Sequence, residues 1–467
     1  MALAHRARAI STCPPDEESS QMPIIACVLL PALAAALVLT CGFRPGVDKF
    51  PVAASAGVVI AGATSWQSPD MAGWGPLRAD ALSGYAIMAI GIGAILAGFA
   101  LNQQLWAGIA DDSIGPLRAR AHATALPALL ACANLALCAG PAWLQVLGLL
   151  GVAAVASAAL LALRTRAASR AAAWLAVSLT FSAIAIAFGP DMTGSAMPIV
   201  LGVAVYAGFA PVHCWRTRAL SRLPGGLAAV LSGATFVMGF DLLFRLSMTG
   251  TVTALVHWGA LIGLVVAAWG VAAGTDIVRT VTYLGLAGMS IVLFGLGVDD
   301  TELVAAALRQ LLIVLTGTSV LYIAAGGLWA MTGSRRIGTV RGLWRRNPIS
   351  AVVLAAMTVL ISAPLLLGVV APSTMTSARL VGAGLQSGHG IVFGIGLTAA
   401  VVVVVGGALT TLCRMLRGNP DSHPDLAVTA RVSAGGHELL LAGAGLLVLV
   451  IAGMPAAVFA PVLSVVA

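Results

Sequence analysis

The chain has 467 residues, of which 60% are hydrophobic and only 9% are charged, and its mean hydropathy is +1.00. A soluble domain carries roughly 25% charged residues, so this composition excludes a chain folded mainly in water and predicts a surface that faces lipid. The net charge of +8 would suggest nucleic acid in a soluble protein. Here the arginines stand in short segments between apolar runs, which the positive-inside rule explains, and we expect no nucleic-acid partner.

Residues 1–21 are polar and unlike the rest of the chain, so we expect a disordered tail or a misassigned start there. The apolar run from Met22 to Cys41 is long for a signal peptide and opens a series of similar runs. It is therefore interpreted as the first membrane span. We expect residues 22–467 to form one transmembrane domain, with its core at about 122–413.

Further apolar runs follow in series, and a helix needs about 20 such residues to cross the bilayer. The candidate spans lie near 22–41, 51–66, 81–101, 122–140, 143–163, 171–189, 195–213, 224–245, 253–273, 280–297, 309–331, 349–371, 389–413 and 437–461. The sequence thus predicts an all-α, polytopic integral membrane protein with about fourteen transmembrane helices.

The basic residues give an independent check on this count. If the N-terminus is outside, the loops after odd-numbered spans are cytoplasmic, and they hold most of the 25 Lys and Arg residues. Among them are Arg216, Arg218 and Arg222, placed in the loop after the seventh run. This alternation predicts that both termini lie outside a prokaryotic cytoplasmic membrane.

The cysteines point to no metal chemistry. None of the seven forms a C-x-x-C pair, and the spacings typical of zinc or iron–sulfur ligands are absent. The chain also has no nucleotide loop and no flavin motif. We expect no metal site, no cofactor and no catalytic residue in this chain.

The seventh run ends in Tyr206-Ala-Gly-Phe-Ala-Pro211-Val-His213. Proline kinks a helix, and transporters use broken helices to expose backbone and proton carriers at mid-depth. An ordinary kink near the helix end, with His213 at the interface, fits the same residues equally well. The twelfth run has a mid-run proline, Pro364, and two Pro-broken spans five apart suggest two repeated halves.

Two charged pairs lie in or beside the apolar runs. Asp241 and Arg245 are four residues apart on the eighth run, so they share one side of a helix and can neutralise each other. Both lie near its predicted outer end, which favours an interfacial pair. Asp276 and Arg279 flank a short cytoplasmic turn and are interpreted in the same way.

Other polar groups stand inside later runs, where ionisable residues are costly. His257 lies in the ninth run, and a lone histidine there is more often a hydrogen-bonded packing residue than a proton carrier. Arg309 and Gln310 open the eleventh run.

Five stretches resemble one family. Residues 210–216 (APVHCWR) resemble its "PFHxWLPDA" signature, and residues 224–245 resemble the helix that follows it. Asp276 begins a stretch similar to "DLKRLLAYSS", Leu321 one similar to "LFLAAGS", and Leu77 one similar to "RLDALS". In this order they resemble the antiporter-like membrane subunits of respiratory complex I, Mrp antiporters and group-four (formate hydrogenlyase-type) hydrogenases. The resemblance implies two inverted five-helix repeats with broken helices.

The resemblance also implies a proton path, in which a fifth-span Glu pairs with a seventh-span Lys and further Lys or His residues follow. By motif spacing these positions are Gly151, Tyr206, Val237 and about Thr318, and the one lysine, Lys49, lies in a loop. Neutral Val and Gly carry no proton, and Tyr has a pKa of about 10. Either the chain is a non-pumping structural member, which we favour, or residual groups carry another path. The candidates are Tyr206, His213, Asp241, His257, Arg309 and Gln310.

The resemblance therefore implies a membrane-arm subunit of a complex I-like or group-four hydrogenase-like redox assembly. Its partners would be other membrane-arm subunits and a redox peripheral arm, with protons, or Na+, as the moved ion. The first alternative is a stand-alone cation/proton antiporter, which the missing carboxylates and lysines disfavour. The second alternative is a purely structural membrane protein.

Overall fold

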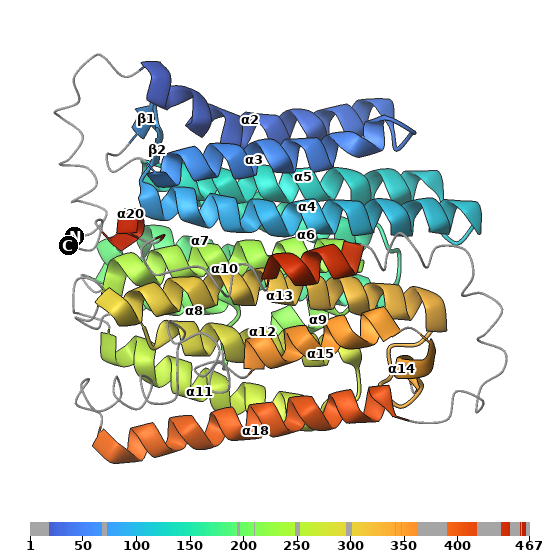
Figure 1. Ribbon diagram of the computed structural model, residues 1–467. Coiled ribbons are helices and arrows are strands. Elements are labelled where there is room, and N and C mark those ends of the chain that lie inside the picture. Colours follow the sequence, from blue (N-terminus) through green and yellow to red (C-terminus); the bar gives the residue numbers. More distant parts are fainter. Residues whose placement is uncertain are drawn as a thin grey trace.

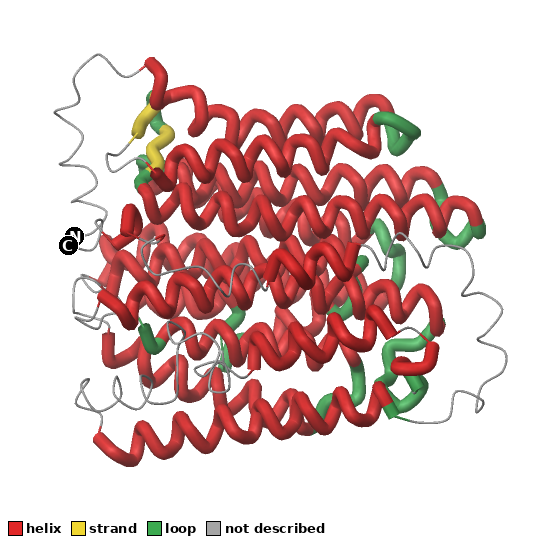
Figure 2. Tube along the Cα trace, in the orientation of Figure 1, coloured by secondary structure: helices red, strands yellow, loops and turns green. Residues whose placement is uncertain are grey.

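The computed structural model describes residues 18–67, 72–193, 197–209, 211–247, 253–295, 301–340, 342–346, 348–362, 390–417, 440–448, 458 and 460–463. In this part of the chain the helices lie side by side along one direction (Figure 1). Figure 2 shows a single short strand pair at one end. Ten of the helices in these residues are long and apolar enough to cross a membrane, and three shorter apolar helices accompany them. The all-α, polytopic architecture predicted from the sequence is confirmed.

The helices follow the order of the predicted runs. They are α2 Glu18–Cys41, α3 Phe50–Gln67, α4 Ala81–Ala110, α5 Pro116–Cys138, α6 Ala142–Leu161, α7 Arg166–Thr193, α8 Met197–Ala207, α9 Cys214–Leu220, α10 Gly225–Ser247, α11 Thr253–Ala272, α12 Ile277–Leu293, α13 Thr301–Thr332, α14 Leu343–Arg346, α15 Pro348–Ser362, α18 Gly390–Leu416 and α20 Ala460–Leu463. A 3-10 turn, η2 Val47–Lys49, precedes α3, and β1 Ala72–Trp74 pairs antiparallel with β2 Leu77–Ala79.

Each predicted run up to 389–413 overlaps one of these helices, although the run 195–213 is helical only to Ala207 and part of the run 349–371 lies outside the described residues. Helix α2 begins at Glu18, a turn before the predicted start, and residues 1–17 lie outside the described part of the chain. Of the last run, 437–461, residues 440–448 and the start of α20 are described as helical. The total of fourteen spans therefore stays a prediction.

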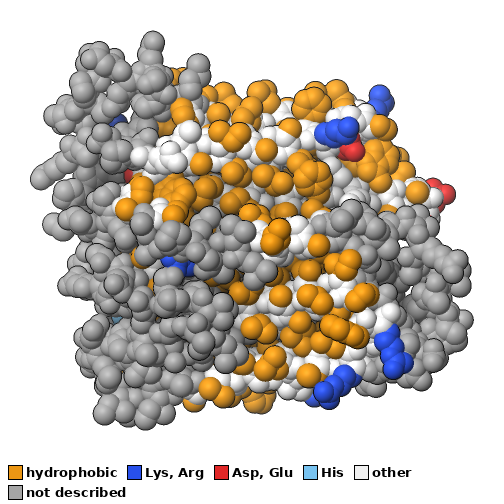
Figure 3. Space-filling model, in the orientation of Figure 1, with side chains coloured by type: hydrophobic (Ala, Val, Ile, Leu, Met, Phe, Trp, Pro, Cys, Tyr) orange, Lys and Arg blue, Asp and Glu red, His pale blue; other side chains and the backbone are white. Residues whose placement is uncertain are grey.

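Burial separates central helices from peripheral ones. Every residue in the most apolar stretch of α13 is buried, as are 94% in α10 and 83% in α4, against 33% in α2. A peripheral helix keeps one side for lipid, and large apolar side chains such as Ile60, Val177 and Trp269 are accordingly exposed. Figure 3 shows hydrophobic side chains spread over the visible face between the two ends.

Small residues bring α3 and α4 close together. A Cβ added at Gly84 would lie 2.5 Å from the backbone nitrogen of Trp66, and one at Gly62 would lie 2.7 Å from that of Met88. Lipid supplies no hydrophobic drive for helices to associate, so close backbone approach through glycine is a common source of packing energy in membranes.

The connections alternate between the two ends of the bundle. The α2–α3 connection, the α4–α5 connection and α14 lie at one end in Figure 1, and the β1–β2 hairpin lies at the other. The first end holds segments that the charge pattern predicts to be cytoplasmic. The order of the connections thus agrees with helices that cross a membrane one after another.

Candidate functional site

A break separates α8 from α9 within the seventh predicted span. Helix α8 ends at Ala207, Gly208 has φ +68°, and α9 begins at Cys214. Positive φ costs glycine little, which makes Gly208 the residue that allows the chain to leave α8. Pro211 is exposed in the turn that follows. Pro364, the expected second break, lies outside the described residues.

Tyr206 is buried on the last turn of α8 and faces the fifth predicted span, α6. Its hydroxyl donates to the carbonyl oxygen of Leu149 over 3.4 Å. Gly151, two residues further along α6, has no side chain, and a Cβ there would lie 2.6 Å from the Sγ of Cys132. The two helices thus meet where the resemblance places a Glu–Lys pair, but with a phenol, a carbonyl and a thiol.

Arg216 belongs to α9 and is only 1% exposed, so its expected place in a cytoplasmic loop is wrong. Its Nη1 donates to the Ala207 carbonyl at 2.8 Å and to Thr235 Oγ1 at 3.2 Å. Its Nη2 donates to the carbonyl of Ser232 at 3.2 Å and to its hydroxyl at 2.5 Å. The short helix after the break turns this arginine inward, where it meets the last carbonyl of α8, which has no partner within that helix.

An aromatic ring completes the surroundings of Arg216. The guanidinium carbon lies 3.5 Å from the centre of the Phe236 ring, within cation–π range. Trp215, its neighbour on α9, donates its indole N–H to the carbonyl of Val205 at 2.7 Å. Two consecutive side chains of α9 therefore bond the carbonyl end of α8.

Hydroxyl groups line the helices next to this arginine. Tyr322 on α13 donates to Thr282 Oγ1 on α12 at 3.0 Å and also interacts with Ser232 and Arg216. The hydroxyl of Thr318 donates to the carbonyl of Val314 in its own helix at 2.6 Å. The resemblance aligns four positions with the proton path through the centre of the subunit, and we name them the axis positions: Gly151, Tyr206, Val237 and Thr318. None of these four is a Lys, Glu or His.

Asp241 belongs to a three-residue ion cluster that we name the ion triad: Asp80, Asp241 and Arg245. Arg245 donates Nη1 to Asp80 Oδ2 at 2.6 Å and Nη2 to Asp80 Oδ1 at 2.9 Å. The same arginine reaches Asp241 Oδ1 at 2.9 Å through Nη2, and Asp241 is only 2% exposed. Two carboxylates share one guanidinium, so the triad carries a net charge of −1 when both are ionised.

Sequence reasoning missed Asp80 as a partner of Arg245. The carboxylate also accepts a hydrogen bond from the Ser83 backbone N–H at 2.8 Å and so caps α4. Capping aspartates are common, and the partner stands 165 residues further along the chain. The one available signal was that both residues lie in stretches that resemble the same family.

The two candidate histidines pack against aromatic rings. His213 lies between α8 and α9, with its Nε2 3.5 Å from the Tyr283 hydroxyl and the rings edge to face at 5.6 Å. His257 is buried on α11, and its ring stacks on that of Phe294 at 6.0 Å. The arrangement of His257 is consistent with the packing interpretation.

Arg309 and Gln310 are fully buried on α13, two turns after its start. The hydroxyl of Tyr85 on α4 donates to the Leu308 carbonyl and interacts electrostatically with Arg309. Neither atom of the Gln310 side-chain amide has a hydrogen-bond partner in the described part of the chain. A buried polar group of this kind costs about 1–3 kcal/mol.

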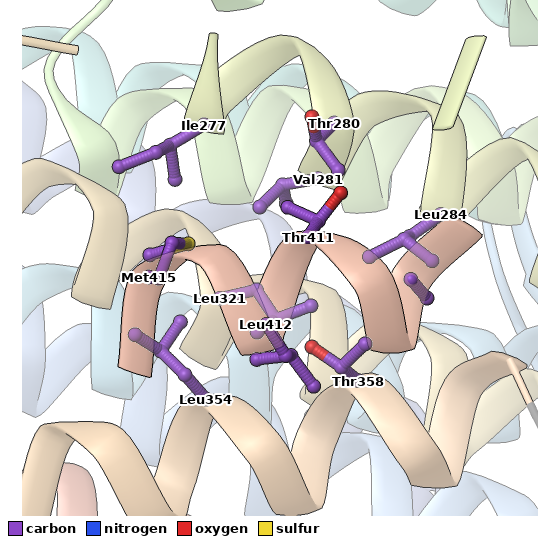
Figure 4. A pocket seen from close by; sticks show the side chains of 11 residues that line it. Ile277, Thr280, Val281, Leu284, Leu321, Leu354, Thr358, Thr411, Leu412 and Met415 are labelled. Carbon is purple, nitrogen blue, oxygen red and sulfur yellow. The ribbon is translucent and has the colours of Figure 1, made fainter. Parts of the chain in front are cut away.

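The motif residues Asp276 and Arg279 begin α12. The Asp276 side chain caps the helix by accepting from the Arg279 backbone N–H at 3.0 Å. A cavity of about 30 Å³ lies between α12, α13, α15 and α18 (Figure 4), lined by aliphatic side chains and by Thr280, Thr358 and Thr411. It has room for about one water-sized molecule, which excludes a substrate-sized ligand.

Within the residues described, no group of three or more His, Cys, Asp or Glu side chains lies close enough to hold a metal ion. Tyr206, His213 and Asp241 each contact a different helix: α6, α12 and, through the ion triad, α4. The geometry therefore gathers these three candidates into separate clusters instead of one row.

Comparison with protein families matches residues 174–401 to the family described as NADH:quinone oxidoreductase/Mrp antiporter, TM. Subunit 3 of the formate hydrogenlyase of Escherichia coli (strain K12) is 27% identical in a match of 175 residues that covers 33% of this chain. That match spans only 28% of the relative's own length.

Solved structures match over almost the entire chain. A chain of the membrane-bound sulfane sulfur reductase, an archaeal respiratory membrane complex, has a TM-score of 0.77 and 17% identity, with 96% of this chain and 97% of that chain covered. A chain of the Mrp complex from a Dietzia species gives 0.75 and 14%, covering 92% and 94%. A chain of respiratory complex I from Thermus thermophilus gives 0.73 and 15%, covering 94% and 99%. The protein thus has the fold of these antiporter-like subunits.

Proposed function

We propose, on the premise that residues 174–401 belong to the antiporter-like membrane-subunit family, that this chain is a membrane-arm subunit of a complex I-like or group-four hydrogenase-like redox assembly. Its partners would be other membrane-arm subunits and a peripheral arm that performs the electron transfer. The fold shared with chains of three multisubunit complexes supports this proposal, as does the sequence match to a formate hydrogenlyase subunit.

Within the assembly the chain is mainly structural. A buried lysine loses its charge readily, so it can bind a proton from one neighbour and release it to the next. The contact of Tyr206 with the Leu149 carbonyl, beside the bare Gly151, carries this part of the proposal. No group that titrates near neutral pH stands at any of the axis positions.

The overall arrangement is part of the same proposal. We assign fourteen spans with both termini outside, and two inverted five-helix repeats within about residues 122–413. The α8–α9 break supports the first repeat. The second break would stand at Pro364, five predicted spans later and outside the described residues.

Purification of the tagged chain from its native membrane tests the assembly. Mass spectrometry should find hydrogenase-like or quinone-oxidoreductase-like subunits in the purified material. Recovery of the chain without such partners contradicts the proposal.

The structural role is tested by Tyr206→Phe combined with His213→Gln, which should leave coupled proton pumping intact, whereas deletion of the subunit should abolish assembly. A pumping defect in a fully assembled double variant contradicts the structural role.

A stand-alone cation/proton antiporter is the second candidate, and the fold likeness to the Mrp complex favours it. It predicts Na+- or K+-dependent proton flux in vesicles that contain this chain alone. Vesicles with an established antiporter provide the positive control. Flux no greater than in empty vesicles removes this candidate.

A further inference from the structure

The buried charge of Arg216 has no acidic partner in the described part of the chain. The two ion pairs found there both involve Arg245, while Arg216 bonds only carbonyl and hydroxyl oxygens and the Phe236 ring. The Ala207 carbonyl is the last of α8, where the helix dipole is negative. This arrangement stabilises a positive charge without neutralising it.

The guanidinium contacts the residues that stand next to two axis positions in the sequence. Ala207, which accepts from Nη1, directly follows Tyr206 in the sequence, and Phe236, which lies under the guanidinium, directly precedes Val237. Tyr322 on α13, which interacts with Arg216, donates in turn to Thr282 Oγ1 on α12. A proton that crossed from the α8 side to the α13 side along the axis would therefore pass this charge.

Arginine differs from lysine in two respects that matter here. Its guanidinium stays protonated in proteins, so it adds a permanent charge and not a switchable carrier. The four hydrogens on Nη1 and Nη2 are all matched by oxygen acceptors. The two terminal amino groups are thus satisfied from within the protein, while the Nε hydrogen has no acceptor among the described residues.

We propose that Arg216 is a fixed electrostatic barrier that keeps protons and alkali cations out of the central axis of this chain. Positive charges exclude cations from other membrane pores in the same way. The inference rests on the proposed function, since a scaffold subunit that does not pump must also not leak. The inference assigns a specific residue to that function and gives a physical reason why protons would not leak through the chain.

Passive proton flux through the full-length chain in liposomes tests the barrier. A pH-sensitive dye inside the vesicles reports the decay of an imposed pH difference. Wild-type vesicles should match empty ones, whereas Arg216→Gln should increase the leak at least tenfold. Arg218→Gln is the matched control, because it removes an exposed charge from the same short helix and should leave the leak unchanged.

A second variant pair covers the case in which Arg216→Gln fails to fold. Ser232→Asp places a carboxylate beside Nη2 and neutralises the arginine in place, so it should also leak, whereas the near-isosteric Ser232→Asn should stay tight. Tight vesicles with either folded neutralising variant overturn the barrier, and leaky wild-type vesicles do so as well. A tight Arg216→Gln variant that still purifies with its redox partners would remove the barrier and leave the proposed function standing.

Discussion

The hydroxyl of Tyr206 lies 3.4 Å from the carbonyl oxygen of Leu149, and this contact joins the broken helix α8 to α6. It stands where a resemblance drawn from sequence places an acid–base pair. The two helices meet at this contact, and neither a phenol nor a backbone carbonyl exchanges a proton readily near neutral pH. The contact can therefore hold the helices together without moving charge.

Tyr206→Phe should have little effect. Loss of one neutral hydrogen bond costs about 0.5–1.5 kcal/mol, so thermal unfolding in detergent should shift by a few degrees and coupled proton pumping by the assembly should not change. Tyr206→Lys should unfold at a much lower temperature, because its charge would be buried beside Gly151 with no carboxylate opposite. Loss of pumping in an assembled Tyr206→Phe complex would instead make the phenol a proton relay.

The ion triad predicts the order in which three substitutions lower the stability of the protein. Arg245→Gln leaves the buried Asp241 and the partly buried Asp80 without their shared cation and should cost about 3–5 kcal/mol. Asp80→Asn should cost much less, since it keeps the cap on α4 and leaves a neutral Asp241–Arg245 pair. Asp80→Ala should fall between them because it also loses the cap. Chemical unfolding in detergent measures all three, and a larger cost for Asp80→Asn than for Arg245→Gln contradicts the charge count.

The positions of the helices were predictable because a membrane span must be long and apolar whatever its neighbours are. The side-chain clusters were much harder to predict. Asp80 and Arg245 are 165 residues apart, and nothing local to either indicates the other. Arg216 looked like one of several loop arginines, since the charge rule counts residues and does not show that α9 turns inward. Burial of a charge depends on the tertiary fold, and periodicity does not show it.

The α3–α4 contact should depend on Gly84. Gly84→Ala would place a Cβ 2.5 Å from the Trp66 backbone nitrogen, so the helices must move apart, at a cost of about 1–3 kcal/mol. Gly259→Ala on α11 is the control, because nothing lies within 4 Å of the added Cβ. That change should stabilise the helix by about 0.5–1 kcal/mol through lower chain entropy. Unfolding temperatures of the two variants should move in opposite directions, and equal shifts would contradict the close packing.

Gln310→Met should leave the protein as stable as before or more so. Both amide atoms are buried without a hydrogen-bond partner among the described residues, and replacement by an apolar side chain of similar length removes that cost. Asn134→Leu is the contrasting change, since Asn134 donates to the Cys27 carbonyl at 2.7 Å and the loss should destabilise. If Gln310→Met abolished pumping in an assembled complex, Gln310 would belong to a residual ion path.

The predicted orientation can be tested by labelling single cysteines placed at opposite ends of the bundle. Trp74 lies exposed in the β1–β2 hairpin, and Ser113 lies exposed in the α4–α5 connection at the other end. Because most Lys and Arg residues stand on the Ser113 side, the positive-inside rule places Ser113 in the cytoplasm. In a cysteine-free background, a membrane-impermeant maleimide should label Trp74→Cys in intact cells and label Ser113→Cys only after permeabilisation. Labelling in the reverse order would invert the assigned topology. Asp80 directly follows the hairpin in the sequence, so its contact with Arg245 would then lie toward the cytoplasmic side.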